Sequence, residues 1–252
     1  MKKLLIMTML LSGTAFSQTT PLINSGEVKI NYPCEVLDKL PKEKEEKESI
    51  TFYDLDNNPV YVAGYILRKR VNTDSKEADF TIKYRTRSPS IILDQTLYKK
   101  LSGSPSGKLK CEFDVPYNHV ELMPTYSCSF KSDTENPLDE HLQFVRMVKV
   151  PLPHFTRDIE NFREFNAQGQ SWNLKLTPEQ QKKSPFKKKI SLEKWTVRNE
   201  CRLEVSGRIE TVKGDSKVIH RAAGEAFAFL MGVIPGSPAP KQGSKTKWVL
   251  GL

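Results

Sequence analysis

Positively charged residues alternate with apolar ones in two neighbouring stretches of the sequence, and their chemistry is informative. Arg68 and Arg70 would share one face of a β-strand, because side chains two residues apart point to the same side. Lys83 and Arg85 would do the same on a second strand. A guanidinium donates two parallel hydrogen bonds to a phosphate group, and an ammonium adds a compact charge. The pattern predicts a sheet face that binds phosphate oxygens.

Carboxylates join these cations on three further stretches that alternate in the same way. Their oxygen atoms are the ligands that Mg²⁺ or Mn²⁺ prefers. The candidate metal ligands are Glu27, Glu112 and Glu204, and the additional candidate anion-binding residues are Lys29, Arg198 and Arg202. An ordinary antiparallel sheet with one solvated face would show the same alternation, and ion pairs among these residues would then replace any ligand.

The elements that carry these residues can be predicted from the period of the apolar positions. Alternation predicts strands, and an apolar stripe at helical spacing predicts helices. The predicted strands are 25–31, 50–53, 61–71, 80–87, 91–93, 109–115, 120–123, 126–130, 144–150 and 194–207, and the predicted helices are 154–165 and 218–232. The charged segment 42–49 has no apolar face and is predicted to be a solvated loop or helix end. The basic segment 182–189 is interrupted by proline and is predicted to be a loop.

The charged face of the predicted sheet carries both signs of charge and little serine or glutamine, and helices could cover its apolar face. We therefore predict an α+β fold, an antiparallel β-tunnel that is closed or nearly closed, with a few helices packed outside. Its charged lumen would contain water, ion pairs or a polyanion, because buried charge without a partner is costly.

One stretch of the sequence resembles a known family. YDLDNNPVYVAGYILRKR, followed by FTIKYR, is similar to the CYTH, or triphosphate tunnel metalloenzyme, pattern. That pattern has Tyr-Asp-Thr, an apolar position, a Gly, Leu-Arg-x-Arg and a later strand of Thr-x-Lys type. The matching residues are Tyr53, Asp54, Gly64, Leu67, Arg68, Arg70, Thr81 and Lys83. The resemblance is best over 25–115 and weaker over 144–232.

The resemblance implies a tunnel whose basic residues bind a triphosphate or polyphosphate, whose glutamates hold Mg²⁺ or Mn²⁺, and in which water or another nucleophile attacks the phosphate chain in line. One departure bears on catalysis. The family's Glu-x-Glu-x-Lys strand reads SGEVK here, so that Ser25 replaces the first Glu. Glu112, Glu200 or Glu204 could compensate for the missing ligand, and otherwise only anion binding would remain.

The N-terminus predicts export. Lys2 and Lys3 precede a short apolar run, and small residues at 15 and 17 offer a cleavage site before Gln18. Residues 1–17 are therefore predicted to be a signal peptide, and the mature protein periplasmic or secreted. The apolar run is too short to span a membrane, and no later segment is apolar enough to do so.

The mature chain is predicted to form one CYTH-like tunnel domain over 18–234. A tail over 235–252 is rich in Pro, Gly, Ser and Lys, and is predicted to be a flexible basic segment that stays loose until its final WVLGL.

Four cysteines in an exported chain predict two disulfides. Three pairings are possible, and a hairpin turning near 116–119 would bring Cys111 opposite Cys128 and leave Cys34 for Cys201. The chain has no C-x-x-C motif and its four histidines show no metal spacing, so no zinc site is expected.

The formal net charge of +9 favours an anionic partner, and we expect a phosphate-rich small molecule or polyphosphate. No nucleic-acid motif is present. Three functions remain open. The chain could be an exported metal-dependent phosphohydrolase, a non-catalytic polyanion-binding protein, or a structural or interaction domain whose own ion pairs fill the lumen.

Overall fold

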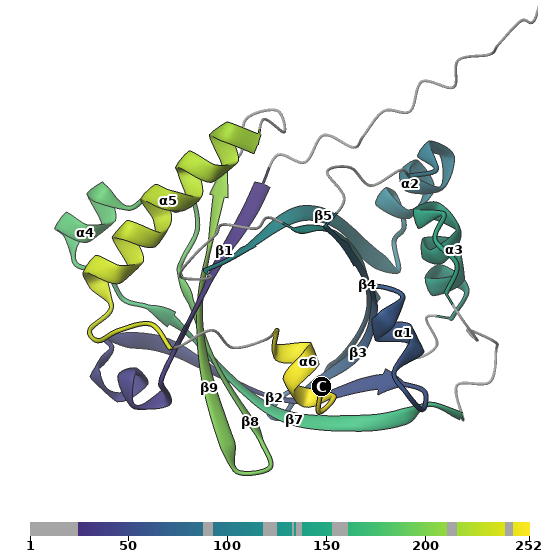
Figure 1. Ribbon diagram of the computed structural model, residues 1–252, viewed down its shortest axis with the longest axis horizontal. Coiled ribbons are helices and arrows are strands. Elements are labelled where there is room, and N and C mark those ends of the chain that lie inside the picture. The colour runs from purple at the N-terminus through teal and green to yellow at the C-terminus, as the bar shows by residue number, and fades with distance from the viewer. Residues whose placement is uncertain are drawn as a thin grey trace, which may run out of the picture.

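The computed structural model describes residues 25–87, 93–117, 125–132, 134, 138–152, 161–210, 216–239 and 244–252. Nine strands among these residues close into a barrel, seen end-on in Figure 1. They are β1 (Ser25–Tyr32), β2 (Lys42–Asp54), β3 (Tyr65–Asn72), β4 (Ala78–Thr86), β5 (Gly107–Pro116), β6 (Thr125–Ser132), β7 (Arg163–Leu174), β8 (Ser191–Val197) and β9 (Glu200–Glu210). The predicted signal peptide and the predicted strand 120–123 lie outside the described residues, as does most of 91–93.

The strand order around the barrel is β1-β5-β6-β4-β3-β2-β7-β8-β9, and β9 pairs with β1 to close it. The pair β1 and β5 is parallel, and the other strand pairs of the described barrel are antiparallel. The predicted α+β tunnel with a closed sheet is therefore confirmed, with one parallel pair in an otherwise antiparallel barrel.

Helices cover the outside of the barrel on two sides (Figure 1). The helical elements are η1 (Cys34–Lys39, a 3-10 helix), α1 (Pro59–Val62), α2 (Gln95–Ser102), α3 (Leu138–Val148), α4 (Pro178–Lys183), α5 (Ser216–Val233) and α6 (Lys245–Val249). The buried face of α5, with Ala223 and Leu230, packs on outward residues of β1 and β9 such as Val28 and Val205. On the other side, α3 packs on β4 and β6, and α2 packs on α3 and β5. The apolar faces of the strands thus point outward and their alternate residues point into the lumen.

One end of the lumen is apolar and is covered by α6. Inward-facing Phe52 and Trp195 form a buried cluster with Val249 and Leu250 near the end of the chain. Figure 1 shows α6 at the lower side of the barrel opening. The tail was predicted to be loose up to its final WVLGL, but residues 245–247 belong to α6, because burial of these apolar side chains fixes the last helix in place.

Two predictions about strand boundaries were wrong. The charged segment 42–49 was predicted to be a solvated loop or helix end, but it belongs to β2, because β7 supplies hydrogen-bonding partners along its length across a bulge between Glu43 and Glu46. The predicted single strand 194–207 is two strands joined at Arg198 and Asn199. Both have positive φ, 48° and 68°, which is typical of a tight two-residue hairpin turn.

Three further elements also differ from the prediction. The segment 144–150 was predicted to be a strand, but most of it lies in α3, where Phe144, Met147 and Val148 are buried at helical spacing. The strand predicted over 61–71 begins only at Tyr65, after the short helix α1. Most of the predicted helix 154–165 lies outside the described residues, and its last three residues begin β7, a strand that was not predicted.

The predicted disulfides are both present. Cys111 faces Cys128 across β5 and β6, with a Cα–Cα distance of 4.0 Å. Cys34 in η1 is joined to Cys201 at the start of β9, across 167 residues of sequence. The second bond ties the first turn after β1 to the strand that closes the barrel.

Candidate functional site

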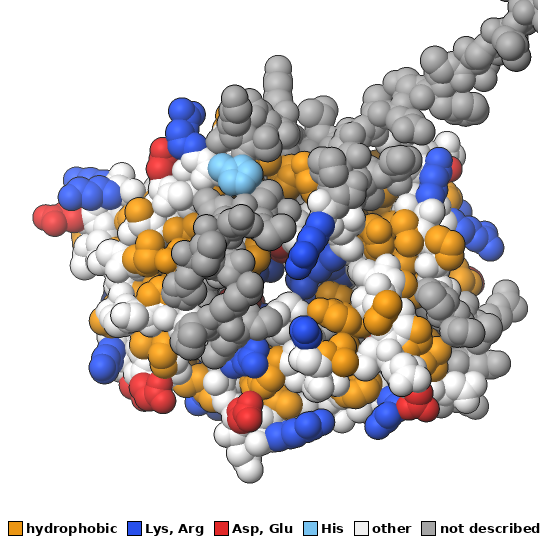
Figure 2. Space-filling view, in the orientation of Figure 1, with side chains coloured by type: hydrophobic (Ala, Val, Ile, Leu, Met, Phe, Trp, Pro, Cys, Tyr) orange, Lys and Arg blue, Asp and Glu red, His pale blue; other side chains and the backbone are white. Residues whose placement is uncertain are grey.

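The lumen gathers charged side chains from six strands. Strand register places the predicted anion-binding residues Lys29, Arg68, Arg70, Lys83 and Arg85 on inward positions, with Glu27, Lys110, Glu112, Asp114, Glu193, Glu204 and Arg208. Figure 2 shows lysine and arginine side chains around the hollow at the centre of one face. The cations and carboxylates thus face one common lumen, as the sequence predicted.

The loop before β3 positions the two arginines of that strand. Asp54 is buried and accepts hydrogen bonds from the backbone N–H groups of Leu55, Val60 and Tyr61, at 2.8 to 3.0 Å. Gly64 has φ +88°, and a Cβ there would lie 2.8 Å from the carbonyl oxygen of Arg85. Two residues of the family pattern therefore shape the entry into β3, because only glycine readily adopts this conformation.

Asp114 is the centre of the largest ion-pair cluster in the lumen. Its carboxylate oxygens lie 2.8 Å from Lys29 Nζ, 2.8 Å from Lys83 Nζ and 3.2 Å from Arg85 Nε. Burial alone would raise the pKa of Asp114, but these three cations hold it well below its ordinary value. The carboxylate is therefore ionised over the whole physiological pH range.

Lysines in this cluster have pKa values shifted in opposite directions. Burial lowers the pKa of Lys29, but Asp114 and Glu27 outweigh burial and raise it well above its usual value. Burial, with the repulsion of Arg85 and Lys29, lowers the pKa of Lys83 to about 8. Lys29 is thus a permanent charge, whereas Lys83 titrates just above neutrality.

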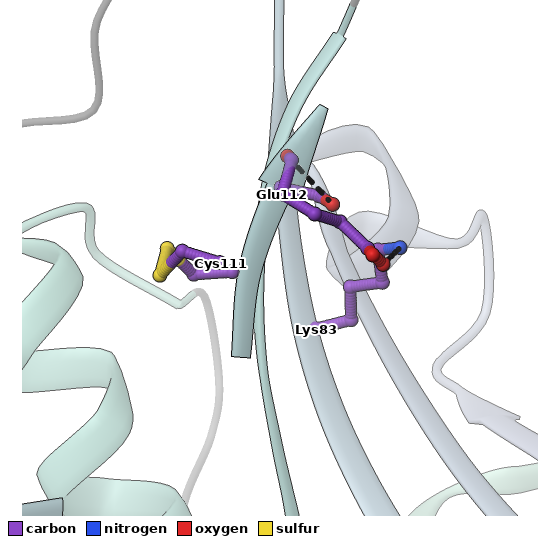
Figure 3. Close-up of a disulfide and its surroundings, with 5 residues drawn as sticks. Lys83, Cys111 and Glu112 are labelled. Atoms are coloured by element: carbon purple, nitrogen blue, oxygen red, sulfur yellow. Dashed lines mark hydrogen bonds and ion pairs between the residues drawn. A yellow bond between two sulfur atoms is a disulfide. The ribbon is translucent and has the colours of Figure 1, made fainter. Parts of the chain in front are cut away.

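Glu112 lies beside this cluster and points into the lumen. Figure 3 shows that Cys111, in its disulfide, points away from the side of β5 on which Glu112 meets Lys83. Glu112 pairs with Lys110, and it lies 3.9 Å from Lys83 and 3.8 Å from Arg208. The alternation of the strand thus separates a structural disulfide from a charged lumen residue.

Three carboxylates come close enough to share a metal ion. Oxygen atoms of Glu27, Glu112 and Asp114 lie within 4.8 Å of one another. This donor set fits Mg²⁺ or Mn²⁺, which prefer oxygen ligands. The predicted ligands Glu27 and Glu112 are brought together, but Glu204 lies apart and pairs with Lys245. Asp114 takes the place of Glu204 in this group. It lies two residues after Glu112 on the same face of β5, and this spacing in the sequence could have identified it as a ligand.

Arg68 differs from the other cations because it has no carboxylate partner among the described residues. Its Nη2 donates a weak hydrogen bond to Thr81 Oγ1 at 3.4 Å, and its buried Nε has no hydrogen-bond partner in the described structure. Burial and the charge of Arg70 lower the pKa of Arg68 to about 9. Arg70 pairs with Glu48 at 3.4 Å, but its buried Nε also lacks a hydrogen-bond partner there. An anion between the two would supply the acceptors.

The other two predicted anion-binding residues lie near one mouth of the barrel. Arg198 occupies the β8–β9 turn and is exposed, so it does not lie on the lumen face as the unbroken strand had implied. Arg202 stacks on Trp248 of α6, with its guanidinium carbon 4.3 Å from the ring centroid. Both line a cavity of about 240 Å³ together with Lys247.

No family model and no curated protein matches the chain. Among solved structures, the putative adenylyl cyclase HpAC1 from Hippeastrum, described as having a dominant triphosphatase activity, is 12% identical with a TM-score of 0.52, over 91% of this chain and 96% of that one. A putative adenylate cyclase from Bacillus halodurans is 10% identical with a TM-score of 0.48, over 90% and 99%. A protein from Pyrococcus horikoshii is 12% identical with a TM-score of 0.46, over 90% and 98%.

Identities this low establish the architecture alone. The Hippeastrum structure extends over almost the whole of both chains, and its likeness agrees with the closed barrel and the charged lumen described above. The resemblance of the sequence is confirmed at this level. The chain has a CYTH-like triphosphate tunnel fold.

Proposed function

We propose that the tunnel binds a triphosphate or polyphosphate through the cations of its lumen. The observation that carries this proposal is Arg68, a half-buried arginine that faces the lumen. Its buried Nε has no hydrogen-bond partner, and its guanidinium has no carboxylate partner, among the described residues. Folded proteins rarely leave such a group unsatisfied. Arg70 lies two residues further on the same face and would contact the same anion. The triphosphatase activity described for the Hippeastrum protein supports this class of ligand.

Hydrolysis of the bound chain would require a metal. Glu27, Glu112 and Asp114 would hold Mg²⁺ or Mn²⁺, which would neutralise charge that develops on the phosphoryl oxygens. Lys29 and Lys83 now neutralise Asp114. With these carboxylates on a metal, both ammonium groups would be free to bind phosphate oxygens.

Binding without hydrolysis is the second candidate, and a specific observation favours it. Each carboxylate of the metal group already has a lysine partner: Lys29 for Glu27 and Asp114, and Lys110 for Glu112. A metal must displace these ammonium groups, which weakens its binding. Ser25 also replaces the first glutamate of the family's motif. The competing interaction-domain hypothesis is that ion pairs of this kind fill the lumen completely.

The test compares Arg68→Met with Lys69→Met. Lys69 is the adjacent cation on the outer face of β3, where its ammonium lies 5.3 Å from the ring centroid of Phe80. Binding of tripolyphosphate would be measured by calorimetry at low ionic strength, where screening is weakest. We expect Arg68→Met to weaken binding about ten- to a hundred-fold, the range for loss of a charged hydrogen bond, and Lys69→Met to leave it unchanged.

Three outcomes separate the candidates. Phosphate release with Mg²⁺ or Mn²⁺ that is lost in Glu112→Gln supports hydrolysis. Binding of tripolyphosphate without release supports the non-catalytic binder. Absence of binding by the wild-type protein at low salt refutes both and leaves the interaction domain.

Export is also part of the proposal. Two disulfides support an oxidising compartment, and no helix of the described residues is long and apolar enough to cross a membrane. Mass spectrometry of the protein purified from its native cells tests this prediction. A mature N-terminus at Gln18 is expected, and an intact Met1 with reduced cysteines would contradict it.

A further inference from the structure

The lumen contains an ammonium group that the chain itself supplies. Lys245, the first residue of α6, places its Nζ 2.5 Å from Oε2 of Glu193 and 2.9 Å from Oε1 of Glu204. The same atom lies 4.4 Å from the ring centroid of Trp195. Two carboxylates and the face of an indole ring are a good environment for one positive charge. We call Glu193, Glu204 and Trp195 the ammonium cage.

The cage is built by the barrel and not by α6. Glu193 and Glu204 are direct cross-strand partners on β8 and β9. Two like charges in this position repel each other unless a cation lies between them. Trp195 donates its Nε1 hydrogen to Oε2 of Glu193 at 3.1 Å and so orients that carboxylate. If Lys245 leaves the cage, the two carboxylates lose the cation that lies between them.

A cavity of about 220 Å³ lies against Arg70 and part of the ammonium cage. It is lined by Arg70, Glu193 and Trp195, and also by Glu46 and Glu48. The buried Nε of Arg70 has no hydrogen-bond partner among the described residues. The cavity thus has one surface suited to an anion and another suited to a cation. Within this cavity the carboxylates would repel a further phosphate group, whereas they would attract the positive end of a ligand with charges of both signs.

We propose that the ligand of the tunnel is a phosphorylated primary amine, whose phosphate chain binds at Arg68 and Arg70 and whose ammonium group displaces Lys245 from the ammonium cage. This inference rests on the proposed function and adds the chemical class of the organic part. In the ligand-free protein, Lys245 satisfies the cage and acts as an internal competitor, because it occupies the position of the ligand's cation.

The experiment compares three probes in calorimetry at low salt: tripolyphosphate, 6-aminohexyl triphosphate and the uncharged hexyl triphosphate. Lys245→Met removes the competitor and keeps an apolar side chain of similar length. In this variant we expect the amino ester to bind about ten-fold more tightly than the hexyl ester, as a desolvated charge pair can supply. Glu193→Gln in the same background should abolish the difference. Lys194→Met, at an outward-facing position of β8 next to Glu193, is the control and should behave as wild type.

Two results overturn this inference. Equal affinities of the two esters in Lys245→Met refute the ammonium cage as a ligand site, while binding of tripolyphosphate shows that the proposed function still holds. Failure of all three probes refutes the proposed function, and this inference with it.

A measurement on the wild-type protein is independent of whether the variants fold. If the amino ester displaces Lys245, it releases α6 and accelerates tryptic cleavage after Lys247, whereas the hexyl ester leaves the rate unchanged. Equal cleavage rates with both esters would also overturn the proposal.

Discussion

Replacement of Arg68 by methionine should make the protein more stable while it removes the anion site. Burial and Arg70 lower the pKa of Arg68 from its ordinary 12.5 to about 9. Because a pKa unit corresponds to about 1.4 kcal/mol, the charged side chain is opposed by roughly 3–5 kcal/mol. Methionine retains an apolar stem and carries no charge. We expect the free energy of unfolding to rise by about 1–3 kcal/mol, as for other buried ions replaced by apolar residues.

The assay is urea unfolding at pH 7 and at pH 10, each with and without tripolyphosphate. A lowered arginine pKa opposes folding most strongly below the folded-state value of about 9, and the opposition is relieved as pH rises above it, because the unfolded state then binds more protons. The advantage of the variant should therefore shrink at pH 10. Tripolyphosphate should stabilise the wild type more than the variant, because the variant binds it more weakly.

A loss of stability in Arg68→Met at pH 7 would refute this reasoning. It would mean that groups within the protein already satisfy the guanidinium, so that no anion is needed to complete the site.

Three other predictions use the same unfolding assay. Asp114→Asn removes the charge of the carboxylate that Lys29, Lys83 and Arg85 share and should cost about 3–5 kcal/mol, whereas Asp56→Asn, which breaks the exposed ion pair with Arg163, should change stability by less than about 0.5 kcal/mol; similar losses would contradict the assigned burial of Asp114. Gly64→Ala should cost more than about 1 kcal/mol because of its positive φ and close contact, and a neutral result would exclude that conformation. Replacing Cys34 and Cys201 together by serine should cost about 2–5 kcal/mol, and unchanged stability would show that the bond does not constrain the unfolded chain.

The lumen could be predicted from the sequence because strand alternation depends only on the period of the side chains. Arg68, Arg70 and Lys83 lie on one face of their strands regardless of which strands are neighbours. The pairing of Cys111 with Cys128 followed from a hairpin in the same local way. These features required no knowledge of long-range contacts.

Features that depend on distant partners were missed. The charged start of β2 is a strand only because β7 pairs with it from more than a hundred residues away. Phe144 was assigned to a strand because a short apolar segment is compatible with a strand or a helix. Packing on the barrel stabilises the helix α3. The position of Lys245 could not be predicted, because no local sequence pattern indicates that a lysine near the C-terminus enters the lumen.

The position of β1 in the barrel has a consequence for the order of folding. Its neighbours are β5 and β9, so the first strand of the chain cannot complete its hydrogen bonds until Glu210 has been synthesised. Contacts this distant in sequence slow folding, because a long loop must close before they form. During synthesis, β1 therefore keeps an unpaired edge until β9 forms. A chaperone that shields this edge would protect the protein from aggregation before the barrel closes.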